Sequence, residues 1–346
     1  MQHLYSYIIE KQGYLDYSSF IDDILNQFSQ NENFIKKIWE YIVNKSESIE
    51  FNILVESDNY PYWLEKLYID AYPLDDYTLA GVSPDLIVLN KDKTKVKSAT
   101  LIINESYFDD AINEITNLMY KLHGNDYKGD LTRDDINQLK AIKILDIKSI
   151  DKTVISHEIK HIFDFLIGNS KQDKGLLRSF DGNSYLNISS DNHEISSSYF
   201  LESISELLYF FDLTEESAFQ QQLIEYIRLN KISKEEIENF LHKINKSTAS
   251  KFDFESSDLE YYHGSLKKFI GICMLISVSY CSLQELSRET ISELCTIIKQ
   301  YEVSEIVLHK KFNGSTYKDL KIFYLKCYDA FKQHIVKMVK KAAKHL

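Results

Sequence analysis

The chain has 346 residues, enough for two domains or for one large domain with additions. Apolar residues make up 44% and charged residues 27%, and 24 Tyr with 19 Phe exclude a disordered chain. The 52 acidic residues against 40 basic ones give a net charge of −12, which argues against general nucleic-acid binding because such proteins carry a basic surface.

The N-terminal stretch, residues 1–48, is predicted to be a helical segment, because apolar residues recur at helical spacing from Phe20 to Phe28. Its first residues have neither a charged region nor a long apolar run of the kind that a signal peptide carries. We therefore expect a cytoplasmic protein.

Three short, β-branched and apolar stretches are predicted to be strands: residues 50–56, 85–89 and 99–104. A polar stretch, NKDKTKVKS, joins the last two and favours a hairpin with a long or irregular tip. All three prolines fall between the first and second predicted strands, so we expect that stretch to be a loop.

The rest of the chain reads as helices. A helix over residues 108–122 is predicted to end at Gly124, and the next opens with a capping box formed by Thr132 and Asp135. A loop is expected from Asn169 to about Asp191, and a second capping box is expected at Ser233 and Glu236. The other helices are predicted at residues 151–168, 195–211 and 215–229, and then in succession to the C-terminus.

One motif carries chemistry, and it is His157-Glu158-Ile-Lys-His161. Two histidines at i and i+4 project from one helix face, where both imidazoles can bind a tetrahedral Zn²⁺. Glu158 can then reach a metal-bound water without becoming a ligand, and can act as general base. Apolar residues from Ile155 to Leu166 give the helix a buried back. The simpler alternative is a helix with two surface or half-buried histidines and an i,i+3 contact between Glu158 and His161.

The segment VISHEIKHIFDF, residues 154–165, resembles the zincin metallopeptidases. The resemblance covers roughly residues 50–230 and implies a small twisted sheet over the HExxH helix, with an edge strand that pairs with the substrate backbone. We therefore predict an α+β fold: a zincin-like domain at residues 49–230, the helical segment before it, and a C-terminal helical region at residues 231–346.

The third metal ligand decides the zincin subgroup. The metzincin pattern would need Gly at 164 and His or Asp at 167, but this chain has Asp164 and Ile167. Asp164 is expected either to orient an imidazole or to be a solvated helix acid. An aspzincin arrangement would use Asp181, whose flanking residues do not match that family.

A gluzincin-like arrangement, with a glutamate from a downstream helix, remains, and we favour Glu215. The stretch from Glu215 to Ala218 resembles the E-x-x-A signature of the ligand helix in several gluzincin-like families, including toxin and phage-type members. Against this, Asp212 and Glu215 also fit a capping box, in which Glu215 would only cap its helix. The alternative ligands are Glu194, Glu202, Glu206 and Glu216.

A hydrolase of this type also needs a group that stabilises the tetrahedral intermediate. Tyr209 resembles the upstream tyrosine of some E-x-x-A families, and Tyr185, Tyr199 and His193 are nearby in sequence. We name Tyr209 as the candidate.

Features outside the motif predict location and partners. The four cysteines form no CxxC pair and are expected to be buried free thiols of a reducing compartment. The longest apolar stretch, Phe269–Cys281, is too short to span a bilayer, so no transmembrane segment is expected. The basic stretch Lys326–Leu346 is predicted to be a packed terminal helix, with contact to an acidic partner or a membrane surface as the alternative.

These observations predict a zinc-dependent metallopeptidase that hydrolyses peptide or protein substrates. His157, His161 and Glu215 would hold Zn²⁺, with Glu158 as general base. The rival is a non-catalytic structural or interaction protein, such as a phage virion component, on a zincin-like scaffold. Abundant Lys, Ile and Asn beside scarce Arg, together with the E-x-x-A pattern, favour a phage or mobile-element origin and leave a virion-associated location open.

Overall fold

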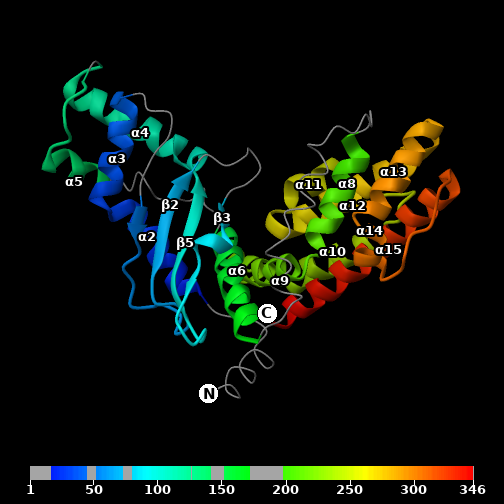
Figure 1. Cartoon of the computed structure of the whole chain (residues 1–346). Helices are drawn as coiled ribbons and strands as arrows, with labels where there is room; N and C mark the ends of the chain where they lie inside the picture. Colours follow the sequence, from blue (N-terminus) through cyan, green and yellow to red (C-terminus); the bar gives the residue numbers. More distant parts are fainter. Residues whose placement is uncertain are drawn as a thin grey trace. The chain divides into compact units, whose positions relative to one another are not determined.

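The computed structural model describes residues 17–44, 52–72, 80–125, 127–141, 152–171 and 198–345 (Figure 1). The chain divides into two compact units, residues 1–174 and 175–346. A small mixed sheet belongs to the first and the second is mostly helical, so the α+β class is as predicted. The three-part division at residues 48/49 and 230/231 stays a prediction.

A five-stranded sheet organises the N-terminal unit. Its strands are β1 (Asn52–Leu54), β2 (Leu67–Tyr72), β3 (Ala80–Val82), β4 (Val88–Leu89) and β5 (Val96–Asn104). The order is β1-β2-β5-β3, and β4 also pairs with β5. β2 and β5 run parallel, with Leu67 opposite Ala99, and the other pairs are antiparallel.

The prediction of a loop between the first two expected strands was wrong, because β2 and β3 lie there. β2 alternates buried and more exposed residues and is paired on both sides, with β1 and β5. Pro61 and Pro84 lie outside the strands, and Pro73 lies outside the described residues. The expected strand 85–89 is also shorter than predicted, since a 3-10 turn occupies Pro84–Leu86.

The predicted hairpin between β4 and β5 is confirmed. Asn90 closes it by donating its N–H to the carbonyl of Lys95 at 3.0 Å, and Lys93 at the tip has a φ of 54°. This left-handed residue fits the irregular tip that the polar stretch predicts.

The helices of this unit follow the predicted signals. Gly124 ends α4 with a φ of 99°, and the Thr132–Asp135 capping box is present, since each residue accepts the other's backbone N–H. The predicted loop from Asn169 starts too early, because α6 continues to Lys171. The helices are α2 (Ser18–Gln30), α3 (Glu32–Asn44), α4 (Asp109–His123), α5 (Arg133–Ala141) and α6 (Lys152–Lys171).

Helix α6 packs against β3 and β5, beside the edge of the sheet (Figure 1). Ile155, Ile159 and Ile162 are fully buried, which confirms the predicted apolar back. Each such side chain contributes about 2 kcal/mol relative to exposure. Trp63, also buried, packs on Phe163 with ring centroids 5.2 Å apart. These contacts fix which face of α6 the histidines occupy.

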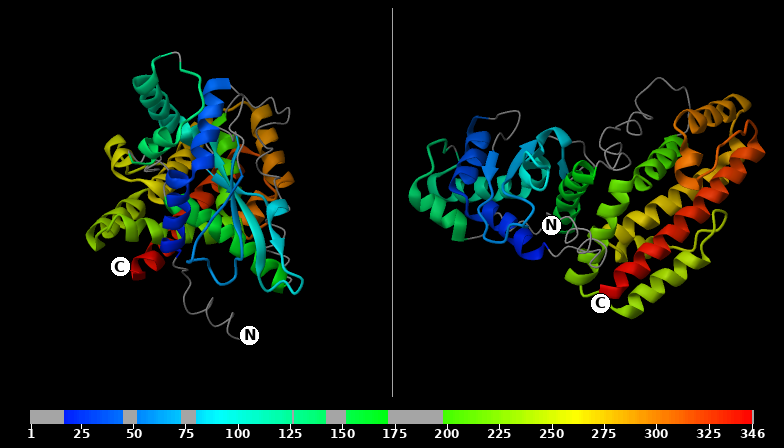
Figure 2. Two further views of the ribbon diagram at one scale, coloured as in Figure 1. Left: turned by 90° about the vertical axis from the view of Figure 1, so that its left-hand side faces the viewer. Right: turned by 60° about the horizontal axis from the view of Figure 1, so that its bottom comes forward.

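The C-terminal unit is a bundle in which α12 and α15 lie side by side (Figure 2) and α8 and α9 pack on α12. Phe210 stands at its centre, in ring contact with Phe219, Phe269 and Phe331. The helices are α8 (Ser198–Phe210), α9 (Leu213–Leu229), α10 (Lys234–Lys246), α11 (Ser256–Tyr261), α12 (Gly264–Ser282), α13 (Arg288–Gln300), α14 (Val303–Leu308) and α15 (Tyr317–Ala342).

Helix α12 is apolar and packs against α8, α9 and α15, and the expected absence of a transmembrane segment stays a prediction. Among the described residues, Gly264–Glu285 is the one helical stretch long and apolar enough to cross a membrane, and half of its window is buried in the protein. The predicted packed terminal helix is confirmed, because α15 buries ten side chains on one face. Its contact with an acidic partner or a membrane stays a prediction.

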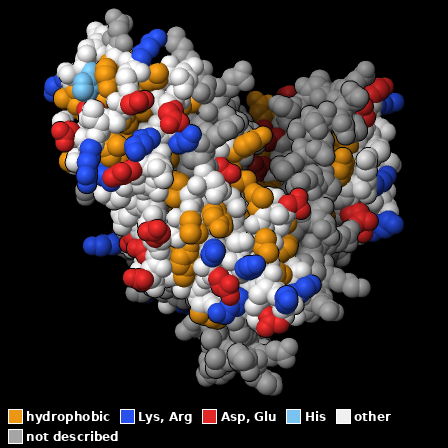
Figure 3. Space-filling model, turned by 60° about the vertical axis from the view of Figure 1, so that its left-hand side comes forward, with side chains coloured by type: hydrophobic (Ala, Val, Ile, Leu, Met, Phe, Trp, Pro, Cys, Tyr) orange, Lys and Arg blue, Asp and Glu red, His pale blue; other side chains and the backbone are white. Residues whose placement is uncertain are grey.

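The cysteines are free thiols, as expected, but only three are buried and Cys281 is exposed. Large apolar side chains also remain exposed on the sheet-bearing unit, among them Tyr62 and Tyr72. Figure 3 shows hydrophobic side chains interspersed with charged ones over the face that it presents. Scattered exposure of this kind is ordinary for a globular protein.

Candidate metal centre

The two histidines of the motif meet on one face of α6. His157 and His161 are 5% and 8% exposed, and their Nε2 atoms lie 3.0 Å apart. The rings stand edge to face, with centroids 4.7 Å apart. The alternative of two surface or half-buried histidines is therefore wrong, since both rings are buried and their Nε2 atoms converge.

The separation of the two nitrogens suits a shared ion. Two imidazole nitrogens about 2.05 Å from one zinc ion, at a tetrahedral angle, lie about 3.3 Å apart. The observed 3.0 Å is close to this value. Because the spacing comes from one turn of a single helix, it requires no long-range rearrangement.

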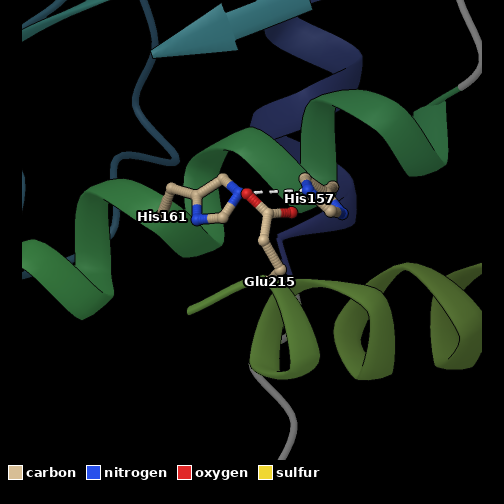
Figure 4. Close-up of side chains that lie close together, drawn as sticks. All are labelled: His157, His161 and Glu215. Atoms are coloured by element: carbon tan, nitrogen blue, oxygen red, sulfur yellow. Dashed lines mark hydrogen bonds between the residues drawn. The ribbon is translucent and has the colours of Figure 1, made fainter. Parts of the chain in front are cut away.

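Glu215, in the first turn of α9, supplies a third donor. One ligand atom from each of His157, His161 and Glu215 lies within 4.8 Å of the other two, and Figure 4 shows the carboxylate between the two rings. Among the described residues this is the one group of histidine, cysteine or acidic side chains with such spacing. Donors around one tetrahedral zinc ion are about 3.3 Å apart.

Asp212 fixes the start of α9. Its side chain accepts hydrogen bonds from the backbone N–H of Thr214 at 2.9 Å and of Glu215 at 3.4 Å. Asp212 is therefore the cap of this helix, and the carboxylate of Glu215 lies with the imidazoles. The backbone of Glu215 thus takes part in the cap, as the capping alternative expects, while its carboxylate lies near the imidazoles.

The rival ligands have other surroundings. Glu206 lies 3.7 Å from Lys268, and Glu216 lies 3.0 Å from His334. The contact with His334 lowers the pKa of Glu216 below its ordinary value. Glu202 is exposed on α8, and Glu194 lies outside the described residues.

Glu158 and Asp164 are further buried acidic side chains of α6. Glu158 is 8% exposed, and its role as a base stays a prediction. Asp164 is 6% exposed and forms an ion pair with Lys160, so the interpretation as a solvated helix acid is wrong. Its Oδ2 has no hydrogen-bond partner among the described residues. Asp181 lies outside them.

Tyr209, the candidate oxyanion donor, packs within the helical unit. Its ring meets Phe219 edge to face at 5.8 Å, and the Lys268 ammonium lies 4.7 Å from its centroid. Its catalytic role stays a prediction. Tyr199 is exposed, while Tyr185 and His193 lie outside the described residues.

The edge of the sheet also fits the zincin resemblance. Among the described strands, β3 lies at the edge of the sheet next to β5, and it contacts α6. An edge strand beside the HExxH helix is what that resemblance implies.

Sequence reasoning missed two partners around the motif. Lys160 could have been found, because it stands four residues before Asp164 on the same helix. His334 carries no local signal, since it comes from α15 and reaches Glu216 only through the fold.

No protein-family model matches the chain, and neither a curated protein nor a solved structure matches it. The candidate metal centre therefore stands on the motif and its geometry.

Proposed function

We propose that this chain is a zinc-dependent metallopeptidase of gluzincin-like type. The observation that carries the proposal is the convergence of His157, His161 and Glu215. Two neutral imidazoles and one carboxylate form a donor set that catalytic zinc sites use, with a fourth position left for substrate or water.

Within this proposal, His157, His161 and Glu215 would hold the ion. Zinc bound there would supply Lewis-acid chemistry near neutral pH. Glu158 takes a proton from the attacking water and passes it to the leaving amine. Its place directly after His157 on α6 and its 8% exposure favour this role, because they hold the carboxylate beside the candidate ligands.

A structural metal site is the second candidate, and the burial of both histidines favours it. A protein of this kind would bind zinc to stabilise its fold and would catalyse nothing. In that case the chain would be an interaction protein or a virion component built on the same zincin-like scaffold.

Metal analysis beside a Glu158→Gln variant separates the two. The enzyme predicts one zinc per chain in both proteins, with hydrolysis of a casein or peptide-library substrate lost in the variant. Zinc in both proteins without hydrolysis by either supports the structural site. Absence of zinc binding in both contradicts the metal centre altogether.

A further inference from the structure

Helix α9 is tied to α15 next to the candidate ligand. Glu216 follows Glu215 directly, and its Oε1 lies 3.0 Å from Nε2 of His334. One turn later, Gln220 donates from its side chain to the carbonyl of Met338 at 3.3 Å. The same face of α9 thus contacts α15 at two successive turns.

The His334 ring is itself held in place. It stands 5.5 Å from the ring of Phe210 and 5.3 Å from that of Phe211. Its side chain is 17% exposed, against 36% for Glu216. A ring in contact with two aromatic neighbours is held more firmly than a long exposed side chain, whose ion pairs contribute little.

Rotation of α9 is the motion that this anchor resists. A carboxylate about 6 Å from the helix axis moves by about 1 Å when the helix turns by about 10°. Metal–ligand distances tolerate about 0.2 Å, which corresponds to a rotation of about 2°. Asp212 caps the end of α9 but leaves the rotation about its axis to side-chain contacts.

We propose that His334, through Glu216, is a positioning residue that sets the rotation of α9 and so preorganises Glu215 for the metal. This inference rests on the proposed function. Neither His334 nor Glu216 is one of the three candidate ligands. Their contribution is to hold the third ligand where it can bind without reordering the helix.

The test measures zinc affinity by competition with a chromogenic chelator, and the melting temperature of the zinc-free protein, for Glu216→Ala, Glu216→Gln and His334→Asn. We expect Glu216→Ala and His334→Asn to weaken zinc binding by about 10-fold, the lower end for partners that orient metal ligands. Glu216→Gln, which keeps a side chain of the same size against the His334 ring, should retain most of the affinity. The double variant should be no weaker than either single one.

Lys243→Met provides the matched control. Lys243 pairs with Asp258 between α10 and α11, and their side chains are 37% and 11% exposed. Like the His334–Glu216 pair, this pair has one side chain that is mostly buried. This variant should lower the melting temperature and leave zinc affinity unchanged.

The outcomes separate the inference from the proposed function. Unchanged zinc affinity in Glu216→Ala and His334→Asn, with a lowered melting temperature, would make the pair purely structural and overturn the inference alone. If the wild-type protein binds no zinc, or if Glu215→Ala binds zinc as tightly as the wild type, both the inference and the proposed function are overturned.

Discussion

Replacing Glu215 with alanine removes one of three candidate protein donors and leaves the His157–His161 pair intact. Loss of a group that only orients a ligand weakens metal binding by about 10- to 100-fold. We expect loss of the ligand itself to exceed about 100-fold, or about 2.8 kcal/mol. The zinc affinity of Glu215→Asp should lie between those of the wild type and Glu215→Ala. The shorter side chain withdraws the carboxylate by about 1.5 Å, whereas metal–ligand distances tolerate about 0.2 Å.

The same loss appears in thermal stability. At zinc concentrations about 1,000 times the wild-type Kd, binding stabilises the folded protein by about 4.1 kcal/mol. A variant with 100-fold weaker binding, in the same solution, gains only about 1.4 kcal/mol. The rise in melting temperature on adding zinc should therefore shrink to about a third in Glu215→Ala.

Chelator competition gives Kd and differential scanning fluorimetry gives the melting temperatures. Glu202→Ala is the control, because Glu202 is exposed on α8 and was a rival ligand. Its affinity should equal that of the wild type. Affinity of Glu215→Ala within about threefold of wild type, or a fall in Glu202→Ala as large as the one expected for Glu215→Ala, would refute the ligand assignment.

Other substitutions test the surrounding structure by urea unfolding. Lys160→Met leaves the buried Asp164 carboxylate without its cationic partner and should lower the free energy of unfolding by about 3 kcal/mol. Adding Asp164→Leu to the same chain should recover most of this loss. Gly124→Ala should destabilise by about 1–3 kcal/mol, because its φ is 99°, whereas Gly271→Ala inside α12, where an added Cβ meets nothing within 4 Å, should stabilise by about 0.5–1 kcal/mol. Hydrogen bonds from Ser315 and Thr316 lower the pKa of Asp319, so its contribution to stability, taken as wild type minus Asp319→Ala, should be present above about pH 4 and vanish as the pH falls below it.

Local signals predicted the helix that carries the motif. The i,i+4 spacing of His157 and His161 and the apolar back from Ile155 to Leu166 are properties of one helix, so they required no knowledge of the rest of the chain. The capping residues at Thr132 and Gly124 were readable for the same reason.

Strand β2 was missed because its stability comes from pairing. LYIDAY is a short alternating stretch near prolines, and those prolines suggested a loop. Its partners, β1 before it and β5 well after it, are what make it a central strand. Local sequence carries no record of such pairing.

The sequence alone also left the identity of the third metal ligand undecided, because that choice depends on how distant helices pack. Glu202, Glu206, Glu215 and Glu216 all lie on helices downstream of the motif, and sequence alone did not rank them beyond the E-x-x-A pattern. The fold separates them, because Lys268 and His334 neighbour two of the rivals while the carboxylate of Glu215 lies with the histidines.

If His157, His161 and Glu215 bind one zinc ion, X-ray absorption spectroscopy of the protein loaded with one zinc per chain should detect them as its ligands. We expect two imidazole nitrogens at about 2.0–2.1 Å, oxygen for the remaining donors, and no sulfur. A sulfur scatterer at about 2.3 Å, or a shell without imidazole, would contradict it.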